Sequence, residues 1–342
     1  MGLKIAFIAR TGTPNAYYRA VGPLMALTAR GHGLAQVMGE GQPPNHGALA
    51  ECDLLLVHRF SEGDPLTAMR TVHERGVPVV WDNDDDVVAP QRASGAGRRR
   101  WNAVERQRLV GSIRRVHRLA SVVTTPSAQL AEGYREDGAR NVHVIENYLP
   151  SQFVLARRPQ RADDTVTIGW TAAFEHEVDA RELRLPQLLR RLMEAHPQVR
   201  VASLGVDLGL PRDRYRRSRP LPFDQVAPWA ASFDIGIAPL TDIRLNRARS
   251  NIKLKEYAGA GTPWVASAVG PYVGLGERQG GLLIDNDRWY ETLERLVLDA
   301  GQRRRLGEQG LAWARTQTIE TNAAVWERLL TGLVSEAAAL RR

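Results

Sequence analysis

The sequence predicts an α/β protein with two domains, each built on a parallel sheet that helices cover. Apolar runs of strand length alternate with segments whose apolar residues recur at helical spacing, a pattern typical of β-α-β units. This alternation is interrupted once, at residues 150–164, where two prolines and polar residues indicate a linker, and then restarts. The length of 342 residues suits two domains of ordinary size.

The first half of the chain contains segments for six strands and four helices. A helix over Tyr17–Arg30 ends at Gly31, a residue type that commonly follows helix C-termini. Ser127 is expected to cap a short helix. The expected strands are Leu3–Ala9, Leu34–Met38, Leu54–His58, Val77–Trp81, Ser121–Thr125 and Val142–Ile145; further helices are expected over Leu66–Arg75 and in the Arg-rich stretch that ends at Arg118.

The second half repeats the alternation and ends in helices. Its expected strands are Thr165–Trp170, Val199–Leu204, Phe233–Ala238 and Pro263–Ser267, and its expected helices are Ala180–Ala195, Phe223–Ala231, Ser250–Ala260, Trp289–Leu298, Gly301–Thr316 and Glu320–Leu340. Ligands of such open sheets bind at the carboxyl ends of the strands, so we expect a site in the cleft between the two domains.

The composition excludes several classes of protein. A hydrophobic fraction of 43% and a charged fraction of 25% exclude disorder as the main state. No apolar run is long enough to span a bilayer, and the start of the chain does not resemble a signal peptide. Cys52 is the single cysteine, so neither an intrachain disulfide nor a thiolate metal cluster is expected. We therefore expect a cytoplasmic protein, with peripheral contact at the inner membrane as an option.

The net charge of +8 comes almost entirely from arginine, since Lys4, Lys253 and Lys255 are the three lysines among 46 basic residues. Codon bias in a GC-rich genome is the simplest explanation. Nine arginines fall between Arg92 and Arg118. We expect them to form a solvated face, although they could also bind an anionic membrane surface with a lipid-linked acceptor, or a DNA acceptor.

The segment Phe233–Ser267 carries the strongest chemical signal. A buried strand is followed by a polar loop and by a helix that Ser250 is expected to cap, and a helix N-terminus at a strand end can bind an anion. Lys253 lies on the same helix face and adds a positive charge for phosphate. Glu256 follows about 9 Å from Ser250 along the helix, which suits a ribose hydroxyl beside a diphosphate. From spacing alone, an ordinary amphipathic helix with a solvated Lys/Glu pair remains an alternative.

These residues resemble the donor-nucleotide segment of the retaining GT-B glycosyltransferases of family 4. The match is the pattern FDI-x-I-APL-x-D followed by N-x-x-x-S-x-x-K-x-x-E-Y-x-x-x-G-x-P-x-V-A-S. The resemblance extends over about 300 residues, because weaker matches occur in the family's order; they are Tyr18-Arg19, Gly31-His32, Trp81, Asp84-Asp85, Thr125-Pro126-Ser127, Asn147, Ile168-Gly169-Trp170, His176 and Asp179.

The resemblance implies a GT-B fold of two Rossmann-like domains whose parallel sheets face a cleft. Residues 1–155 would form the acceptor domain and residues 163–316 the donor domain, with residues 317–342 packing back on the first domain. The co-substrate would be a nucleoside diphosphate sugar, with no further cofactor. Glu256 would bind the ribose, and Ser250, Asn251 and Lys253 would lie along the diphosphate. Gly169, Trp170 and Arg249 would complete the donor site.

Two departures from the family pattern concern the donor sugar and the phosphates. The first glutamate of the paired-glutamate motif usually touches the donor sugar, and here its position is Ala248. The family's Arg…Lys pair after the first strand of the second domain is also missing, since Gly169–Glu177 offers His176 as its one potential cation. Arg249 or Lys253 would then supply the positive charge.

Other candidates are assigned by their places at strand ends. His58 ends a strand of the first domain and could bind an acceptor or donor sugar, or be structural. His176 and Asp179 are expected to contact substrate, with helix capping as the alternative for Asp179. The turn with Thr13 and Asn15 is expected on the acceptor side, as is Arg19 just beyond it.

The acidic run Asp82–Asp86 could hold a divalent metal as in GT-A glycosyltransferases, but it lies far in sequence from the donor segment. A loop paired with the following arginines is the favoured interpretation, and no metal site is expected. Retaining transfer through a covalent intermediate needs a carboxylate beside the anomeric carbon. None is assignable here, which agrees with the front-face mechanism usually proposed for the family.

The function predicted from the sequence is metal-independent glycosyl transfer of the hexosyltransferase type, from a nucleotide sugar to an acceptor hydroxyl, with retention of the anomeric configuration. The acceptor could be a glycan, a lipid-linked sugar, a small molecule or DNA. A GT-B-type nucleotide-sugar epimerase, which needs no acceptor, is one alternative. A nucleic-acid-binding or DNA-modifying protein on the same scaffold is another.

Overall fold

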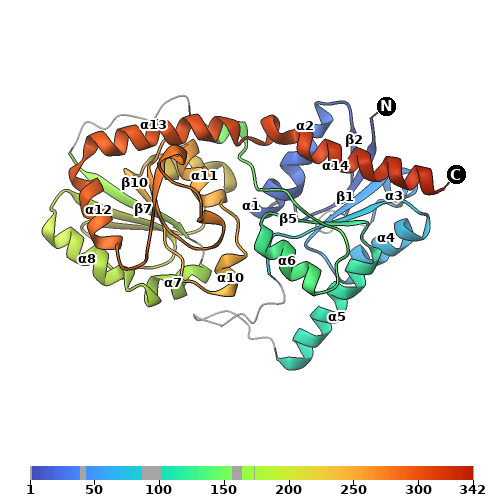
Figure 1. Ribbon diagram of the computed structural model, residues 1–342, viewed down its shortest axis with the longest axis horizontal. Coiled ribbons are helices and arrows are strands. Elements are labelled where there is room, and N and C mark those ends of the chain that lie inside the picture. The colour runs from blue at the N-terminus through green and yellow to red at the C-terminus, as the bar shows by residue number, and fades with distance from the viewer. Residues whose placement is uncertain (1, 39–43, 87–101, 156–163, 173, 342) are drawn as a thin grey trace.

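The computed structural model describes residues 2–38, 44–86, 102–155, 164–172 and 174–341. These segments form two lobes that lie side by side, each with a six-stranded parallel sheet and helices against it (Figure 1). This confirms the α/β class and the two parallel sheets expected from the alternation of strands and helices.

The first sheet has the strand order β2-β1-β3-β4-β5-β6. The sheet grows in one direction from β1 to β2 and in the other from β3 onward, so the loops after β1 and β3 lie beside its switch point, where ligands of open α/β sheets bind. The strands are β1 (Lys4–Ile8), β2 (Gly33–Met38), β3 (Leu54–His58), β4 (Val79–Asp82), β5 (Val122–Thr125) and β6 (Val142–Val144).

Helices connect these strands, as expected from the short loops and the helical spacing of apolar residues in the sequence. The first connection is a continuous helix with a wide π turn in its middle, η1 (Tyr17–Val21), between α1 (Pro14–Ala16) and α2 (Gly22–Thr28). Ser127 caps α6 as expected, accepting from the backbone amide of Leu130 at 3.3 Å. The other helices of this lobe are α3 (His46–Glu51), α4 (Gly63–Glu74), α5 (Ala103–Leu119) and α6 (Ala128–Glu136).

The second sheet has the order β12-β11-β10-β7-β8-β9, and its switch point lies between β7 and β10. Its strands are β7 (Val166–Ala172), β8 (Val199–Gly205), β9 (Tyr215–Ser218), β10 (Ile235–Ala238), β11 (Trp264–Ser267) and β12 (Gly281–Ile284). Its helices are α7 (Glu177–Glu182), α8 (Leu185–Ala195), α9 (Val226–Ala231), α10 (Arg244–Arg247), α11 (Ile252–Gly259), α12 (Trp289–Leu298) and α13 (Ala300–Thr316), with short 3₁₀ turns η3 (Phe174–His176) and η4 (Phe223–Gln225) among them.

The structure departs from the expected elements at a few places. The single helix expected over Ala180–Ala195 is two helices, α7 and α8, because Arg184 between them adopts a left-handed conformation with φ of +48°. Helix α3 and strands β9 and β12 were not expected. Strand β9 has the polar sequence YRRS and lies at a sheet edge, so its sequence carries no apolar signal.

The C-terminal helix α14 (Ile319–Leu340) crosses from the second lobe to the first (Figure 1). Its Trp326 and Leu330 are buried in an apolar cluster with Ile5 and Leu24. The residues expected to be a linker are ordered at their start, where Phe153 is buried against Phe223; residues 156–163 lie outside the described part of the chain. Within the described residues, no helix combines the length and the apolar character that crossing a membrane requires.

Candidate functional site

Helix α11 lies across the switch point of the second sheet. Its Lys253 donates to the backbone carbonyl of Thr171 near the end of β7. The Tyr257 hydroxyl accepts from the Thr171 amide at 2.9 Å and donates to the carbonyl of Ile237 in β10, also at 2.9 Å. The helix is therefore fixed to both strands at the place where such sheets bind phosphate groups.

Lys253 and Glu256 lie three residues apart on one side of this helix. Burial lowers the pKa of Lys253, while the charge of Glu256 opposes that shift. Burial likewise raises the pKa of Glu256, against the opposing charge of Lys253. Glu256 also accepts a hydrogen bond of 2.6 Å from the hydroxyl of Tyr18, which comes from the first lobe. The two lobes thus meet at the carboxylate expected to bind ribose.

Ser250 does not cap this helix as expected. Asn251 occupies the N-cap position, and neither side chain accepts a hydrogen bond from the first turn. Instead Ser250 Oγ accepts from Asn147 at 3.1 Å, and Asn251 donates to Glu146 at 3.3 Å. Both side chains therefore lie beside the expected diphosphate position, but each already has a hydrogen-bond partner in the segment that follows β6.

His176 and Asp179 form a buried hydrogen-bonded pair, with Nδ1 and Oδ2 2.8 Å apart. The second carboxylate oxygen of Asp179 accepts from Thr241 and Asn246 at 2.7–2.8 Å. Burial, aided by the positive charge of Arg249, lowers the pKa of His176 to about 4. The imidazole is therefore neutral at physiological pH, and Asp179 orients it.

Arg249 supplies a second positive charge beside Lys253. Its Nε donates to Asn246 Oδ1 at 3.1 Å, and its Nη1 lies 3.7 Å from a carboxylate oxygen of Glu175 in η3. Its charge lowers the pKa of both His176 and Lys253, so these side chains are grouped at the carboxyl end of β7. Arg249 therefore lies close to both His176 and Lys253.

Gly169 and Trp170 are placed differently from the donor-binding positions expected for them. A Cβ on Gly169 would lie 2.0 Å from the ring of Phe233, so glycine is needed here for packing of the sheet. Trp170 is buried in the apolar core of the second lobe, and its ring packs against His176. Both residues therefore support the site from within the core.

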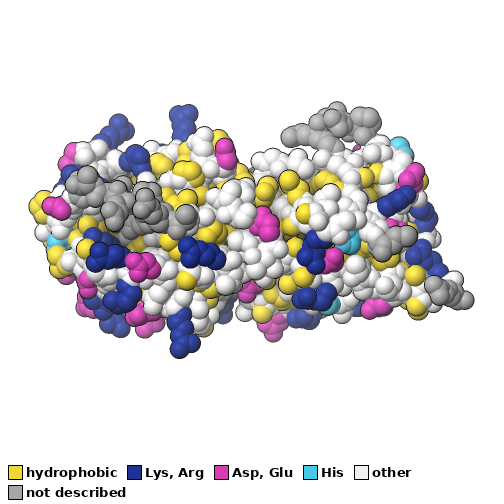
Figure 2. All heavy atoms as spheres, turned by 90° about the horizontal axis from the view of Figure 1, so that it is seen from above, with side chains coloured by type: hydrophobic (Ala, Val, Ile, Leu, Met, Phe, Trp, Pro, Cys, Tyr) yellow, Lys and Arg dark blue, Asp and Glu magenta, His cyan; other side chains and the backbone are white. Residues whose placement is uncertain are grey.

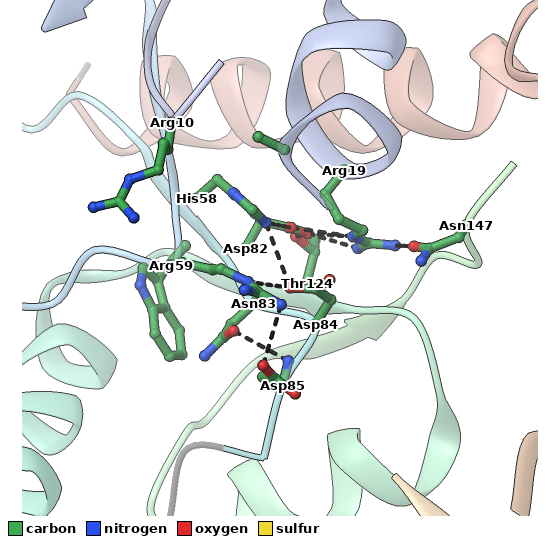
Figure 3. Close-up of polar contacts among 12 residues, drawn as sticks. Arg10, Arg19, His58, Arg59, Asp82, Asn83, Asp84, Asp85, Thr124 and Asn147 are labelled. Carbon is green, nitrogen blue, oxygen red and sulfur yellow. Dashed lines mark hydrogen bonds and ion pairs between the residues drawn. The ribbon is translucent and has the colours of Figure 1, made fainter. Parts of the chain in front are cut away.

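The first lobe has its own polar cluster at the carboxyl ends of β3 and β4 (Figure 3). Arg19, in the π turn, forms a fully buried ion pair with Asp82 at 2.6 Å and donates to Asn147 at 3.0 Å. Thr124 also donates to Asp82, at 2.6 Å. Arg19 was expected on the acceptor side, but its guanidinium has no exposed surface. Its contacts with Asp82 and Asn147 hold the cluster in place from within the lobe.

Arg59 belongs to the same cluster (Figure 3), and its side chain is partly exposed, unlike that of Arg19. It follows β3 with a left-handed φ of +65°, a costly conformation for a residue with a side chain. Its guanidinium pairs with Asp84 and, at 3.2 Å, with Asp85. Burial disfavours the charged form of Asp84, but the neighbouring His58 and Arg59 outweigh it and lower the pKa of Asp84.

His58 is buried beside Asp84, with its Nε2 3.5 Å from a carboxylate oxygen of Asp84 and 3.9 Å from one of Asp82. Both distances are long, and Nε2 has no hydrogen-bond partner within the described residues. Asn15 lies next to this group, and with its amide oxygen toward Arg59 it accepts from that guanidinium at 2.6 and 3.1 Å. Thr13 caps the first helical turn by accepting from Ala16.

The acidic run Asp82–Asp86 has partners spread over both lobes. Arg19 and Arg59 pair with its first, third and fourth members, and Asp86 pairs with Arg244 of the second lobe at 3.1 Å. The arginines at 92–100, which were expected to pair with this run, lie outside the described residues. No group of three or more His, Cys, Asp or Glu suited to a metal occurs in the part of the chain that the structure describes.

The Arg-rich stretch is helix α5 from residue 103 onward, and residues 87–101 lie outside the described chain. The arginines at 108, 114, 115 and 118 are exposed, as expected for a solvated face. On the molecular face shown in Figure 2, basic side chains are scattered among acidic ones rather than gathered into one patch.

Several residues of these clusters were not singled out as site residues from the sequence, among them Tyr18, Arg59, Glu175 and Asn246. Arg59 directly follows a strand end, and that position is the signal that could have revealed it. Glu175 and Asn246 carry no comparable signal, because their roles depend on contacts with Arg249 and Asp179.

The fold is shared with solved glycosyltransferase structures of low sequence identity. Sucrose-phosphate synthase from Thermosynechococcus elongatus matches with a TM-score of 0.68 and 15% identity, covering 97% of this chain and 99% of that one. HepE from Anabaena, solved with UDP-glucose, matches with a TM-score of 0.63 and 15% identity, and the match covers 96% of this chain and 100% of that one. An α-glucosyltransferase solved with UDP-glucose and DNA containing an abasic site matches with a TM-score of 0.64 and 12% identity. This match covers 96% of this chain and 98% of that one.

These likenesses define the class of fold: the chain is a GT-B protein with two Rossmann-like lobes. No family model and no curated protein matches the sequence. The matching structures also include one described as a UDP-N-acetylglucosamine 2-epimerase from Listeria monocytogenes, so the shared fold alone does not distinguish sugar transfer from epimerisation.

Proposed function

We propose that this protein is a retaining glycosyltransferase that moves a hexose from a nucleoside diphosphate sugar to an acceptor hydroxyl without a metal ion. The observation that carries the proposal is the grouping of Lys253 and Glu256 on one face of α11, which is fixed across the switch point of the second sheet. Glu256 would accept hydrogen bonds from the ribose, and Lys253 would bind the diphosphate.

Arg249 and Lys253 supply the charge that the departing diphosphate requires. Both lie at the carboxyl end of β7, and both influence the pKa of His176. Cations held in a partly dry site stabilise a leaving phosphate more strongly than they would in water. This arrangement supports metal-independent departure, because the two cations would balance the charge of the phosphates that a metal balances in other enzymes.

The charge distribution favours front-face transfer over a covalent intermediate. Asp179 already accepts hydrogen bonds from His176, Thr241 and Asn246, so it is poorly placed to act as a nucleophile. In the proposed step, the bond from the anomeric carbon to the phosphate oxygen breaks while the bond to the acceptor oxygen forms on the same face. The acceptor proton passes to the departing phosphate oxygen.

The cluster of His58, Asp84 and Arg59 supports binding of an acceptor in the first lobe. Arg59 is the partly exposed member of this group of three, and Asp84 holds its guanidinium in place, so Arg59 could donate hydrogen bonds to an acceptor. An epimerase needs no acceptor, so this second cluster favours transfer over epimerisation.

Titration calorimetry with UDP, GDP and dTDP tests the donor site. We expect one nucleotide to bind the native protein, and Glu256→Gln to raise its Kd about 10- to 100-fold because a hydrogen bond to a carboxylate is lost. Glu182→Gln, which removes an exposed acid of the same lobe, should leave the Kd unchanged. The proposal is wrong if none of the three nucleotides binds, or if Glu256→Gln binds as the native protein does.

Product analysis separates transfer from epimerisation. Incubation with the donor alone should release the original hexose slowly by hydrolysis, and acceptor should raise turnover. Recovery of an altered nucleotide sugar or an altered hexose without acceptor would instead support the epimerase.

A further inference from the structure

Tyr272 brings a hydroxyl group to the donor site from the loop after β11. Strand β11 pairs with β10 in parallel, so its carboxyl end lies beside the strand that leads into α10 and α11. Tyr272 is the last residue of the short 3₁₀ turn η5 (Gly270–Tyr272), which follows β11. This loop therefore lies next to the segments after β7 and β10 that carry the candidate donor-binding residues.

Gly270 allows this turn to lie directly on α10. It has a left-handed φ of +57°, and a Cβ at this position would lie 2.7 Å from Cα of Arg247 and 2.9 Å from the carbonyl oxygen of Asn246. A side chain here would push the turn and the helix apart. The close contact holds Tyr272 beside the segment that carries Asn246 and Arg249.

The hydroxyl of Tyr272 has no hydrogen-bond partner among the described residues, although the residue is only 2% exposed. Tyr272 lies in the same apolar cluster as Tyr257, whose hydroxyl is hydrogen-bonded to both Thr171 and Ile237. A buried hydroxyl without a partner costs free energy, and phenylalanine at this position would avoid that cost. We therefore expect a ligand to accept the hydrogen bond of Tyr272.

The charges of the donor site act on this hydroxyl. Burial raises the pKa of Tyr272; the positive charge of Arg249 opposes the rise, and the negative charges of Asp179 and Glu256 add to it. Of these three charges, that of Arg249 has the largest effect. The hydroxyl therefore lies near Arg249 and keeps its proton at neutral pH, so it can donate to an acceptor bound beside that guanidinium.

We infer that Tyr272 donates a hydrogen bond to the phosphate group that carries the donor sugar. This inference rests on the proposed function, in which the ribose lies at Glu256 and the diphosphate extends past Lys253 toward Arg249. The phosphate bonded to the sugar would then be the one nearer Arg249. A phosphate oxygen is a charged acceptor, so this hydrogen bond is stronger than one to a neutral group. It strengthens further when the sugar departs, because negative charge then gathers on that phosphate.

Binding of a nucleoside monophosphate and diphosphate tests this contact, because only the diphosphate has the second phosphate. Calorimetry with the full chain measures UDP directly, and it measures UMP by competition against UDP. Tyr272→Phe should raise the Kd for UDP about tenfold, since a hydrogen bond to a charged group is lost. The Kd for UMP should stay within about twofold, which also shows that the variant is folded. If GDP or dTDP proves to be the nucleotide that binds, its monophosphate and diphosphate replace UMP and UDP.

Tyr290→Phe is the matched control, because it removes a hydroxyl from the same lobe, where Tyr290 donates to Glu294 at 3.0 Å. It should leave both affinities unchanged. The inference is overturned if Tyr272→Phe binds UDP as the native protein does, or if it weakens UMP as much as UDP. Weaker binding of UDP-glucose with unchanged binding of UDP would place the hydroxyl at the sugar and would also overturn it. Failure of the proposed function looks different, since then no nucleotide binds the native protein.

Discussion

The His176–Asp179 pair shows at the residue scale how burial determines the charge state of a candidate catalytic group. Burial removes the water that would solvate an imidazolium, and Arg249 adds repulsion, so the pKa of His176 falls to about 4. Asp179 remains charged because His176 and the hydrogen bonds from Thr241 outweigh the effect of its own burial. From the sequence, both residues were expected to contact substrate; their hydrogen bond to each other in a buried position is a feature of the tertiary structure.

This pKa shift predicts a pH dependence of stability. The unfolded chain takes up a proton on His176 near pH 6.5, whereas the folded protein does so only near pH 4. The unfolded state therefore binds more protons in that window, and the free energy of unfolding should fall as the pH drops from 6.5 to 4. Urea unfolding measures this effect. Between pH 7 and pH 5, the free energy of unfolding of His176→Gln should fall by about 1–2 kcal/mol less than that of the native protein.

The exposed His143 provides the control for that measurement. His143→Gln should keep the full pH dependence of the native protein. Equal pH dependence in His176→Gln and native protein would show that His176 titrates normally in the folded state.

At the scale of elements, the helix from Pro14 to Thr28 links the two candidate sites. Its π turn presents two consecutive side chains in different directions: Tyr18 reaches Glu256 in the second lobe, and Arg19 reaches Asp82 beneath the first-lobe cluster. π turns of this kind are rare and occur often at functional sites. Helical periodicity predicted the helix but not the turn, because the wider turn is stabilised by these long-range contacts rather than by local sequence.

Tyr18→Phe tests this link. Tyr18 donates to one carboxylate oxygen of Glu256, and this hydrogen bond also lowers the pKa of Glu256 against the larger effect of burial. The variant should weaken nucleotide binding about 5- to 10-fold at neutral pH, since one hydrogen bond to a charged group is lost. The loss should grow as the pH is lowered, because Glu256 then protonates at higher pH.

Tyr17→Phe is the control, because Tyr17 also packs its ring against Phe223 but donates no hydrogen bond to Glu256. Its nucleotide affinity should equal that of native protein. Stronger binding by Tyr18→Phe than by native protein would show instead that Tyr18 competes with the ribose.

At the scale of the whole molecule, α14 ties the end of the chain to the first lobe. Trp326 is buried at the sheet, with the guanidinium of Arg19 5.6 Å from its ring centre, so the C-terminal helix also supports the first-lobe cluster. Hydrogen bonds from Lys255 to Glu146 and to the carbonyl of Asn147 join the lobes near the same region. The relative position of the two sites therefore depends on segments from both ends of the chain.

Trp326→Ala should lower the free energy of unfolding by about 3–5 kcal/mol, the usual cost of removing a buried aromatic ring. Urea unfolding monitored by circular dichroism measures this change. Arg328→Ala, on the exposed side of the same helix, should change stability by less than about 0.5 kcal/mol. A similar small effect for Trp326→Ala would mean that α14 is not needed to hold the first lobe together.

Much of the architecture could be predicted from the sequence. The buried strands are continuous apolar runs, and the helices carry apolar residues at their own spacing, so the two parallel sheets follow from local pattern. The elements that were missed lack this pattern: β9 is polar, and the break before α8 depends on a left-handed Arg184. Lys253 and Glu256 could be found because a helix fixes their spacing.

What the sequence determined by itself was therefore the α/β class, the two-lobe organisation and the place of Lys253 and Glu256 on one helix. Tertiary structure decided which polar residues meet: Arg59 with Asp84, Glu175 with Arg249, and Tyr18 with Glu256. It also moved Gly169 into the core, where Phe233 fills the space a side chain would need. The physical reason is that the spacing of apolar residues reflects which side of a helix or strand is buried. Charged residues on loops, in contrast, meet only after the sheets have folded and brought the loops together.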